Sequence, residues 1–351
     1  QFMRLMGVDE LNAPARSKAE ERISNVEISM VLDISGSMRY NSKMPNLRNA
    51  AKTFIDEVLR EETEDLISVS LVPYTAQVNA GELIHERLNT INNHGYSYCI
   101  DFEPSDFSST TISLGKEYET MQHFEKSSTR YYGGQRISNP GCPKREYEKI
   151  KPLSQNANVL KSVINNYTHR ANTAIHLGMK WGVALLDPSF RPITQALNAD
   201  GHVDGVFASR PSAYNDPETL KTVILMTDGQ NVDTWRIQPW YYANANHWNH
   251  WNRNALDYYL NRYVRSYQWN NWRYKKYTSG QADAMLDNIC DAAKDQGIVI
   301  WSIGFEVSNF SAGIMENCAS SPAHFFRVEG VEISEAFSSI ASQINQLRLT
   351  Q

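Results

Sequence analysis

Asp33-Ile34-Ser35-Gly36-Ser37 follows directly on the mostly apolar run 26–32, which we expect to be a buried strand. A second apolar run, 222–226, ends in Thr227-Asp228-Gly229. In an open α/β sheet, ligands bind at the carboxyl ends of the strands. Carboxylate and hydroxyl groups supply the oxygen ligands that Mg²⁺ binds in octahedral geometry. The two loops therefore predict one shared site for a Mg²⁺-type cation.

The two loops resemble the metal-ion-dependent adhesion site of von Willebrand factor A domains. That family has Asp-x-Ser-x-Ser after the first strand, a Thr in a middle loop, and Thr-Asp-Gly after a central strand. The middle Thr is expected in Ala171-Asn172-Thr173-Ala174, which opens an apolar-periodic helix. The resemblance implies direct metal contacts from the hydroxyls and partly water-mediated contacts from the carboxylates. The implied ligands are Asp33, Ser35, Ser37, Thr173 and Asp228.

The resemblance also implies how many ions bind and what they do. Met38-Arg39-Tyr40-Asn41 stands where integrins have the acidic residues of an adjacent second site, so we expect one cation, Mg²⁺ or else Mn²⁺ or Ca²⁺. Neutral hydroxyl ligands leave the metal much of its charge, and an Asp or Glu of a partner can replace its exchangeable water. The alternative is a structural ion that only holds the three loops together.

Strands alternate with helices along the chain, which predicts βαβ units and a doubly wound, mainly parallel α/β sheet. We expect the A domain to span 25–348, after a linker or membrane-proximal segment at 1–24. Residues 188–219 read as a polar connector. The expected strands are 26–32, 66–73, 222–226, 298–303 and 324–328. The expected helices are 45–60, 156–168, 174–185, 281–295 and 333–347.

Two large insertions interrupt this pattern. Insertion one, about 80–155, is polar and lacks periodicity, but a structureless loop of that length is unusual, so we expect short strands and a disulfide there. Insertion two, about 230–280, is aromatic and basic and holds six of the eight tryptophans. Such surfaces suit recognition of proteins or sugars, although the rings could instead form a small core. The candidate partner-binding residues are Trp235, Trp240, Trp248, Trp251, Trp269 and Trp272.

The composition narrows the class of protein. The net charge of −5 argues against a nucleic-acid binder. No apolar run reaches the length of about 18 residues that suggests a membrane-spanning helix, and no signal-peptide core is present. The chain begins with Gln1, so we expect that a leader or membrane anchor has been removed from a longer protein.

Four cysteines permit two disulfides in three connectivities. Cys99 and Cys142 share one polar stretch, and Cys290 and Cys318 flank the expected strand 298–303, so we expect each neighbouring pair to form a bridge. Each bridge would add about 3 to 4 kcal/mol of stability in the chain-entropy model. Two bridges would indicate an oxidising compartment. The alternative is four buried thiols in a cytosolic protein.

Within A domains, the chain resembles the TadG-like proteins of bacterial tight-adherence (Flp) pilus systems. The resemblance rests on 27–33, on 69–79, and on Cys290 and Cys318 around 297–305; it covers neither insertion. It implies an N-terminal membrane anchor and a periplasmic or cell-surface location. It also implies a role with minor pilins in pilus assembly or at the pilus tip, with Mg²⁺ binding an acidic residue of the partner.

Other functions are compatible with parts of the sequence. An extracellular polysaccharide-binding protein could use insertion two to bind surface glycans, with a purely structural metal. An intracellular partner of an AAA+ ATPase is a further alternative if the cysteines are reduced. We expect no enzymatic activity, because Walker A, nucleophile-elbow and HExxH motifs are absent. A hydroxyl-rich metal site also lacks the general base that metal-assisted hydrolysis needs.

Overall fold

The structure is a computed structural model that describes residues 24–91, 94–127 and 136–349. All of the expected N-terminal linker except Ser24 lies outside the described residues. Among the helices of the described part, none combines the length and apolar character needed to cross a bilayer.

A six-stranded sheet forms the centre of the described chain, in the order β11-β10-β7-β1-β2-β6. The neighbours from β11 to β2 run parallel, as the doubly wound α/β prediction requires. β6 pairs antiparallel with β2 and extends the sheet at one edge, although the sequence analysis placed its residues in insertion one. The strands are β1 (Asn25–Asp33), β2 (Ile67–Tyr74), β6 (Lys151–Ser154), β7 (Thr219–Thr227), β10 (Val299–Phe305) and β11 (Phe325–Val328).

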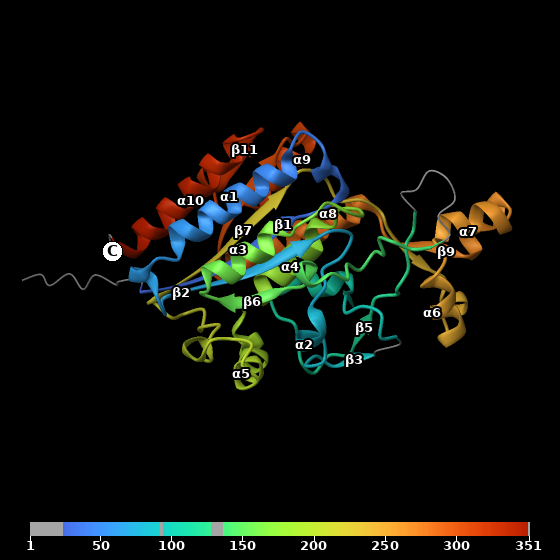
Figure 1. Cartoon of the computed structure of the whole chain (residues 1–351), viewed down its shortest axis with the longest axis horizontal. Coiled ribbons are helices and arrows are strands. Elements are labelled where there is room, and N and C mark those ends of the chain that lie inside the picture. The colour runs from blue at the N-terminus through green and yellow to red at the C-terminus, as the bar shows by residue number, and fades with distance from the viewer. Residues whose placement is uncertain (1–23, 92–93, 128–135, 350–351) are drawn as a thin grey trace, which may run out of the picture.

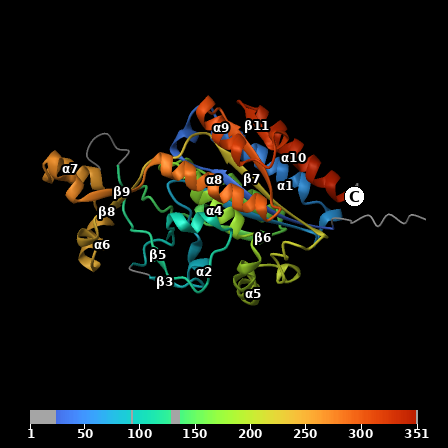
Figure 2. The same cartoon turned by 180° about the vertical axis from the view of Figure 1, so that it is seen from behind.

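Helices cover both faces of this sheet (Figures 1 and 2). One apolar cluster packs α1, α3 and α10 on the first face, and a second packs α4 and α8 on the other. The bounds are α1 (Lys43–Val58), α3 (Ala157–Asn165), α4 (Ile175–Ala184), α8 (Ser279–Asp295) and α10 (Glu332–Leu349). Two further helices, α5 (Arg191–Ala199) and α9 (Asn309–Cys318), were not predicted, and α5 lies inside the expected polar connector. The predicted disulfide Cys290–Cys318 joins α8 to α9.

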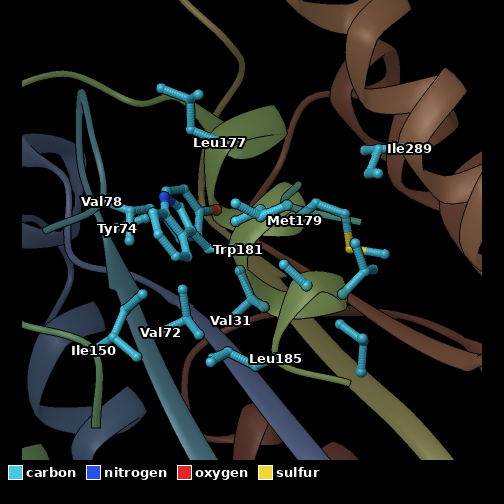
Figure 3. Close-up of a cluster of buried hydrophobic side chains, with 14 of the residues drawn as sticks. Val31, Val72, Tyr74, Val78, Ile150, Leu177, Met179, Trp181, Leu185 and Ile289 are labelled. Carbon is cyan, nitrogen blue, oxygen red and sulfur yellow. The ribbon is translucent and has the colours of Figure 1, made fainter. Parts of the chain in front are cut away.

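The helix α4 lies directly on β1 and β2 and positions the loop that precedes it. Its Trp181 is buried, and Figure 3 shows this ring beside Val31, Val72 and Tyr74 of the sheet. The amide of Ala174, at the start of α4, donates a hydrogen bond to the carbonyl of Thr75 just after β2 (2.8 Å). The loop 166–174 is therefore held at the carboxyl end of the central strands.

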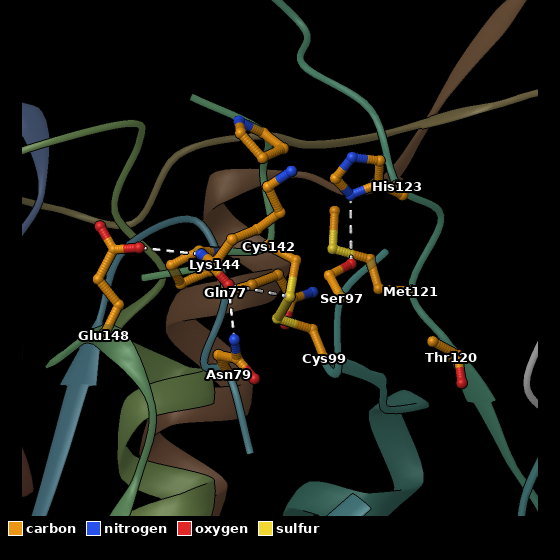
Figure 4. Close-up of a disulfide and its surroundings, with 12 residues drawn as sticks. Gln77, Asn79, Ser97, Cys99, Thr120, Met121, His123, Cys142, Lys144 and Glu148 are labelled. Atoms are coloured by element: carbon orange, nitrogen blue, oxygen red, sulfur yellow. Dashed lines mark hydrogen bonds between the residues drawn. A yellow bond between two sulfur atoms is a disulfide. The ribbon is translucent and has the colours of Figure 1, made fainter. Parts of the chain in front are cut away.

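Insertion one folds around a small sheet and a disulfide. Its strands β3 (Thr90–Ile91), β4 (Ile100–Asp101) and β5 (Tyr118–Thr120) pair in the order β3-β5-β4, after the short helix α2 (Gly81–His85). The predicted bridge Cys99–Cys142 joins this sheet to the returning chain (Figure 4). The insertion is anchored to the loop before α4 by a buried ion pair between Glu148 and Arg170 (3.0 Å).

Insertion two forms an arm, defined here as residues 234–277. It leaves and re-enters the body through the antiparallel pair β8 (Thr234–Ile237) and β9 (Arg273–Tyr277). Its helices α6 (Ala245–Trp251) and α7 (Leu256–Tyr263) lie at the end of the molecule opposite the C-terminus (Figures 1 and 2). Apolar residues of the arm share one cluster with Cys99, Met121, Phe124 and Cys142. The two insertions therefore form one packed unit beside the central domain.

Candidate metal site

The register of the sheet brings the two motif loops to the same place. Leu32 of β1 lies beside Met226 of β7, so Asp33 and Thr227 leave adjacent parallel strands at the same end. On its other side, β1 pairs with β2. The order of the strands therefore reverses at β1: β2 and β6 follow on one side, and β7, β10 and β11 follow on the other. Sheets of this kind bind ligands at such a switch point, outside the carboxyl ends of the strands.

Asp33 is fully buried, and both of its carboxylate oxygens accept hydrogen bonds from the two loops. The Ser35 amide donates to Oδ1 (2.7 Å), and the Thr227 hydroxyl donates to Oδ2 (2.7 Å). Asp33 thus ties the first loop to the end of β7. Thr227 was not among the predicted site residues, although the Thr-Asp-Gly motif contains it.

Ser35, Ser37 and Asp228 form a continuous chain of oxygens beside Asp33. The two serine Oγ atoms are 3.1 Å apart, and the Ser37 hydroxyl donates to Asp228 Oδ1 (2.6 Å). Neighbouring ligands of an octahedral Mg²⁺ are about 2.9 Å apart, because each Mg–O bond is about 2.1 Å long. The separation of the serine oxygens therefore suits two adjacent corners of such an octahedron.

Thr173 lies at the same place and comes from the middle loop. A Cβ atom on Gly229 would lie 3.7 Å from Ser37 Oγ and 3.9 Å from Thr173 Oγ1, so the two hydroxyls flank this glycine. Backbone bonds hold the loops together: the Gly36 amide donates to the Ala171 carbonyl (3.1 Å). A β-carbon on Gly36 would come within 2.8 Å of the same carbonyl, so this close approach needs glycine.

The structure thus brings together all five residues that the sequence analysis selected as ligands. They supply three hydroxyls and two carboxylates, a set of hard oxygen donors that fits Mg²⁺ or a similar divalent cation. Within the described residues, no group of three or more His, Cys, Asp and Glu is placed to hold a metal. A cation at this site would therefore depend on the hydroxyl groups.

A lysine that the sequence analysis missed lies against the second carboxylate. Lys43, in the first turn of α1, places its Nζ 3.1 Å from Asp228 Oδ2 and 3.6 Å from Glu306 Oε2. Its side chain is only 9 % exposed. Glu306 follows β10 and also accepts a hydrogen bond from Asn41 (2.8 Å). The ammonium therefore balances Asp228 at the position next to the candidate cation.

Asp33 has no such cationic partner in the described residues. Burial raises its pKa to about 7, and the nearby charge of Asp228 also raises it, against the lowering effect of the hydrogen bonds from Ser35 and Thr227. The ionised form of Asp33 is therefore costly in the metal-free protein. A bound divalent cation would supply the missing positive charge.

The six tryptophans of the arm do not form one surface. Trp251 is 2 % exposed and belongs to the core shared by the insertions, which corrects its assignment to a partner-binding surface. Trp248, Trp269 and Trp272 are partly buried against the same cluster, and Trp272 stacks on Tyr241 at 3.7 Å between ring centroids. Trp240 is 59 % exposed. Trp235 is half-buried at the base of the arm, with Arg273 4.6 Å above its ring.

Comparisons with known proteins give structural similarity only. No protein-family model and no curated protein matches the chain. Over 92 % of the chain, the structure is similar to the von Willebrand factor domain of the type V pilus tip protein Mfa5 from Porphyromonas gingivalis (TM-score 0.47, 14 % identity, 96 % of that chain). It is also similar to the pilus adhesin SpaC from Lactobacillus rhamnosus GG (TM-score 0.42, 13 % identity), again over 92 % of this chain but only 30 % of SpaC.

A third similar structure comes from an animal. Proximal thread matrix protein 1 from the mussel byssus, with a zinc-occupied MIDAS motif, matches over 95 % of this chain and 47 % of its own (TM-score 0.37, 14 % identity). At these values the comparisons describe a likeness and assign neither a family nor a function.

Proposed function

We propose that the protein is a non-enzymatic adhesion or assembly module. It would hold one divalent cation, Mg²⁺ in the first instance, at Asp33, Ser35, Ser37, Thr173 and Asp228. The cation would capture a carboxylate of a partner protein. The observation that carries this proposal is the convergence of three hydroxyls and two carboxylates from three loops at the carboxyl ends of β1 and β7.

The balance of charge supports capture of an acidic group. Three of the five proposed ligands are neutral, and Lys43 already balances Asp228. A divalent cation there would keep enough positive charge to bind a further carboxylate, and Mg²⁺ commonly exchanges its water ligands for groups of a second molecule.

Among adhesion systems, we propose the bacterial tight-adherence pilus, with minor pilins as partners, because of the resemblance in 27–33 and 69–79. The two disulfides favour an oxidising location outside the cytosol, at the periplasm or cell surface.

The first test is a calorimetric titration of the protein with Mg²⁺ and Mn²⁺. We expect one-site binding, and at least a 100-fold loss of affinity in Asp33→Ala and in Ser37→Ala. Ser302→Ala is the matched control, because Ser302 is a buried serine of β10 whose hydroxyl lacks a hydrogen-bond partner in the described structure. Absence of metal binding to the wild-type protein, or equal binding by all four proteins, would refute the proposed function.

Replacement of Lys43 should strengthen metal binding. Lys43→Met removes a positive charge near the site and leaves Asp228 unbalanced, so we expect the affinity for Mg²⁺ to rise about 10-fold, or about 1.4 kcal/mol. The same change should destabilise the metal-free protein by about 3 kcal/mol, because it leaves a buried carboxylate without its partner. Calorimetry and denaturant unfolding measure the two effects. Lys52→Met on the same helix is the control, since Lys52 donates a hydrogen bond to the side chain of Asn165, away from the metal site. Weaker Mg²⁺ binding in Lys43→Met than in the wild-type protein would contradict this account.

A second candidate function is glycan binding by the arm, with a structural metal. It is favoured by the exposed rings of Trp240, Tyr263 and Tyr267, since each ring offers an apolar face beside a polar N–H or O–H group, as a sugar ring requires. In this case Trp240→Ala combined with Tyr267→Ala should remove binding on a glycan array, and EDTA should have no effect. An array with no signal above background for the wild-type protein would exclude this candidate.

A further inference from the structure

A cleft opens beside the candidate metal site, between insertion one and the base of the arm. Its cavity volume is about 100 Å³. Thr173, a proposed metal ligand, lines this cleft together with its neighbours Ala171, Asn172 and Ala174. The cleft therefore borders the metal site at Thr173, and a partner segment bound at the metal would lie beside it.

Apolar side chains form much of the cleft wall. Met121 and Phe124 come from insertion one, and Val232 and Trp235 come from the base of the arm. Ligand sites in proteins are typically lined by apolar side chains, with a few polar groups that fix the orientation of the ligand. The walls suit a side chain with a long hydrocarbon stem, which can lie along them.

Four charged residues line the cleft, and three of them already have ion-pair partners outside it. Lys126 pairs with Asp257 (3.1 Å), Asp233 pairs with Lys275 (2.7 Å), and Arg236 pairs with Asp101. Glu125 is the fourth, and in the described residues it takes part in no ion pair. Among the residues that the structure describes, the cleft therefore has one acidic side chain without an ion-pair partner.

The carboxylate of Glu125 is only half satisfied by hydrogen bonds. Its Oε2 accepts the amides of Ser138 (2.5 Å) and Asn139 (2.7 Å), which fixes the side chain in place. Its Oε1 is shielded from solvent and has no hydrogen-bond partner in the described structure, and the residue is 2 % exposed. A buried carboxylate oxygen without a donor is unfavourable, and a charged N–H donor is the group that would satisfy it best.

We infer that this cleft is a subsite for a basic side chain, Lys or Arg, of the same partner segment whose acidic residue binds the cation. The hydrocarbon stem would lie on Met121, Phe124 and Trp235, and the charged end would meet Glu125. Because Thr173 borders both the cation and the cleft, the acidic and basic residues would be close in the partner's sequence; two residues of extended chain span at most about 7 Å. The acidic half of this inference rests on the proposed function, whereas the basic half rests on the cleft alone.

The experiment therefore has a metal-free arm and a metal-bound arm. In EDTA, saturation-transfer NMR measures binding of N-acetyl-arginine amide, with N-acetyl-leucine amide as the neutral probe. We expect the arginine probe to bind the wild-type protein, and Glu125→Gln to weaken it at least 10-fold. Asp233→Asn is the matched control on the same cleft and should leave binding unchanged, because the charge of Asp233 is already paired with Lys275.

The second arm uses Gly/Ser peptides that contain one Asp and one Arg, one to three positions apart, in Mg²⁺. We expect Asp33→Ala to remove the contribution of the peptide Asp, and Glu125→Gln to remove only that of the Arg. If Mg²⁺ does not strengthen peptide binding to the wild-type protein, while the arginine probe still binds in EDTA, the proposed function is overturned and the basic subsite is retained. Absence of arginine binding in EDTA, equal binding in Glu125→Gln, or equal binding of the leucine probe would overturn the subsite.

Discussion

Without divalent cations, Asp33 should make the protein less stable as the pH rises from about 4 to about 7. Burial and the charge of Asp228 raise the pKa of Asp33 from 3.8 to about 7 in the folded protein. The folded state therefore binds this proton more tightly than the unfolded state does. The stabilising effect of the proton is complete below pH 3.8 and is lost as the pH approaches 7. A difference of about three pKa units corresponds to about 4 kcal/mol at most.

The variant Asp33→Asn isolates this effect, because the neutral amide has no proton to lose. Denaturant unfolding in EDTA at pH 4.5, 6 and 7.5 measures the free energy of unfolding of both proteins. The value for the variant minus that for the wild type should rise by a few kcal/mol from pH 4.5 to pH 7.5. Only the difference in unfolding free energy between the two proteins reports on Asp33, because other groups also make stability depend on pH. Other carboxyls, such as Asp101 and Asp187, have lowered pKa values and change stability in the opposite direction with pH.

The same two proteins are then compared after Mg²⁺ is added. A cation that neutralises Asp33 should restore the stability of the wild-type protein at pH 7.5 and leave Asp33→Asn almost unchanged. Parallel stability curves for the two proteins in EDTA would show that Asp33 ionises normally in the folded state, and this explanation would fail. Restoration by Mg²⁺ in both proteins would place the cation elsewhere.

The sequence predicted the centre of the fold because buried parallel strands are read as nearly continuous apolar runs. Runs 26–32 and 222–226 became β1 (Asn25–Asp33) and β7 (Thr219–Thr227), with ends shifted by one to three residues. The convergence of Asp33, Ser35, Ser37 and Asp228 followed from strand-end position. Thr173 needed the family resemblance as well, because its loop lies between two helices and no strand end marks it.

The features that the sequence did not reveal depend on contacts between distant residues. Lys43 looks like an ordinary surface lysine in the first turn of a helix, and only Asp228 and Glu306, which are remote in sequence, make it a buried member of the site. The helix α5 is short and has Pro192 in its first turn, so its residues read as part of a polar connector, although Ile193, Thr194 and Leu197 have helical spacing on its buried face. The common core of the two insertions joins Phe124 to Trp251, and no local pattern encodes that pairing.

Gly182→Ala should be strongly destabilising for a change of one methyl group. Gly182 lies in the last turns of α4, where a Cβ atom would clash with Cγ2 of Val31 and come within 3.4 Å of Ser29 Oγ. One turn earlier, a Cβ on Gly178 would lie 2.7 Å from Tyr74 Cδ1 and 2.9 Å from Val31 Cγ1. Neither strand can retreat, because β1 is paired with β2 and β7, and β2 is paired with β1 and β6. Overpacking of this kind costs about 1 to 3 kcal/mol.

Gly313→Ala is the matched control for this prediction. Gly313 lies inside α9, and a Cβ there meets nothing within 4 Å, so the same substitution should stabilise the protein by about 0.5 to 1 kcal/mol through its helix propensity. Because α4 fixes Thr173 at the metal site, a helix displaced from β1 should also weaken Mg²⁺ binding in Gly182→Ala, and Gly313→Ala should leave it unchanged. Denaturant unfolding and Mg²⁺ calorimetry of the two variants measure both effects. Equal stability changes in the two variants would mean that α4 does not need close contact with the sheet to hold the middle loop in place.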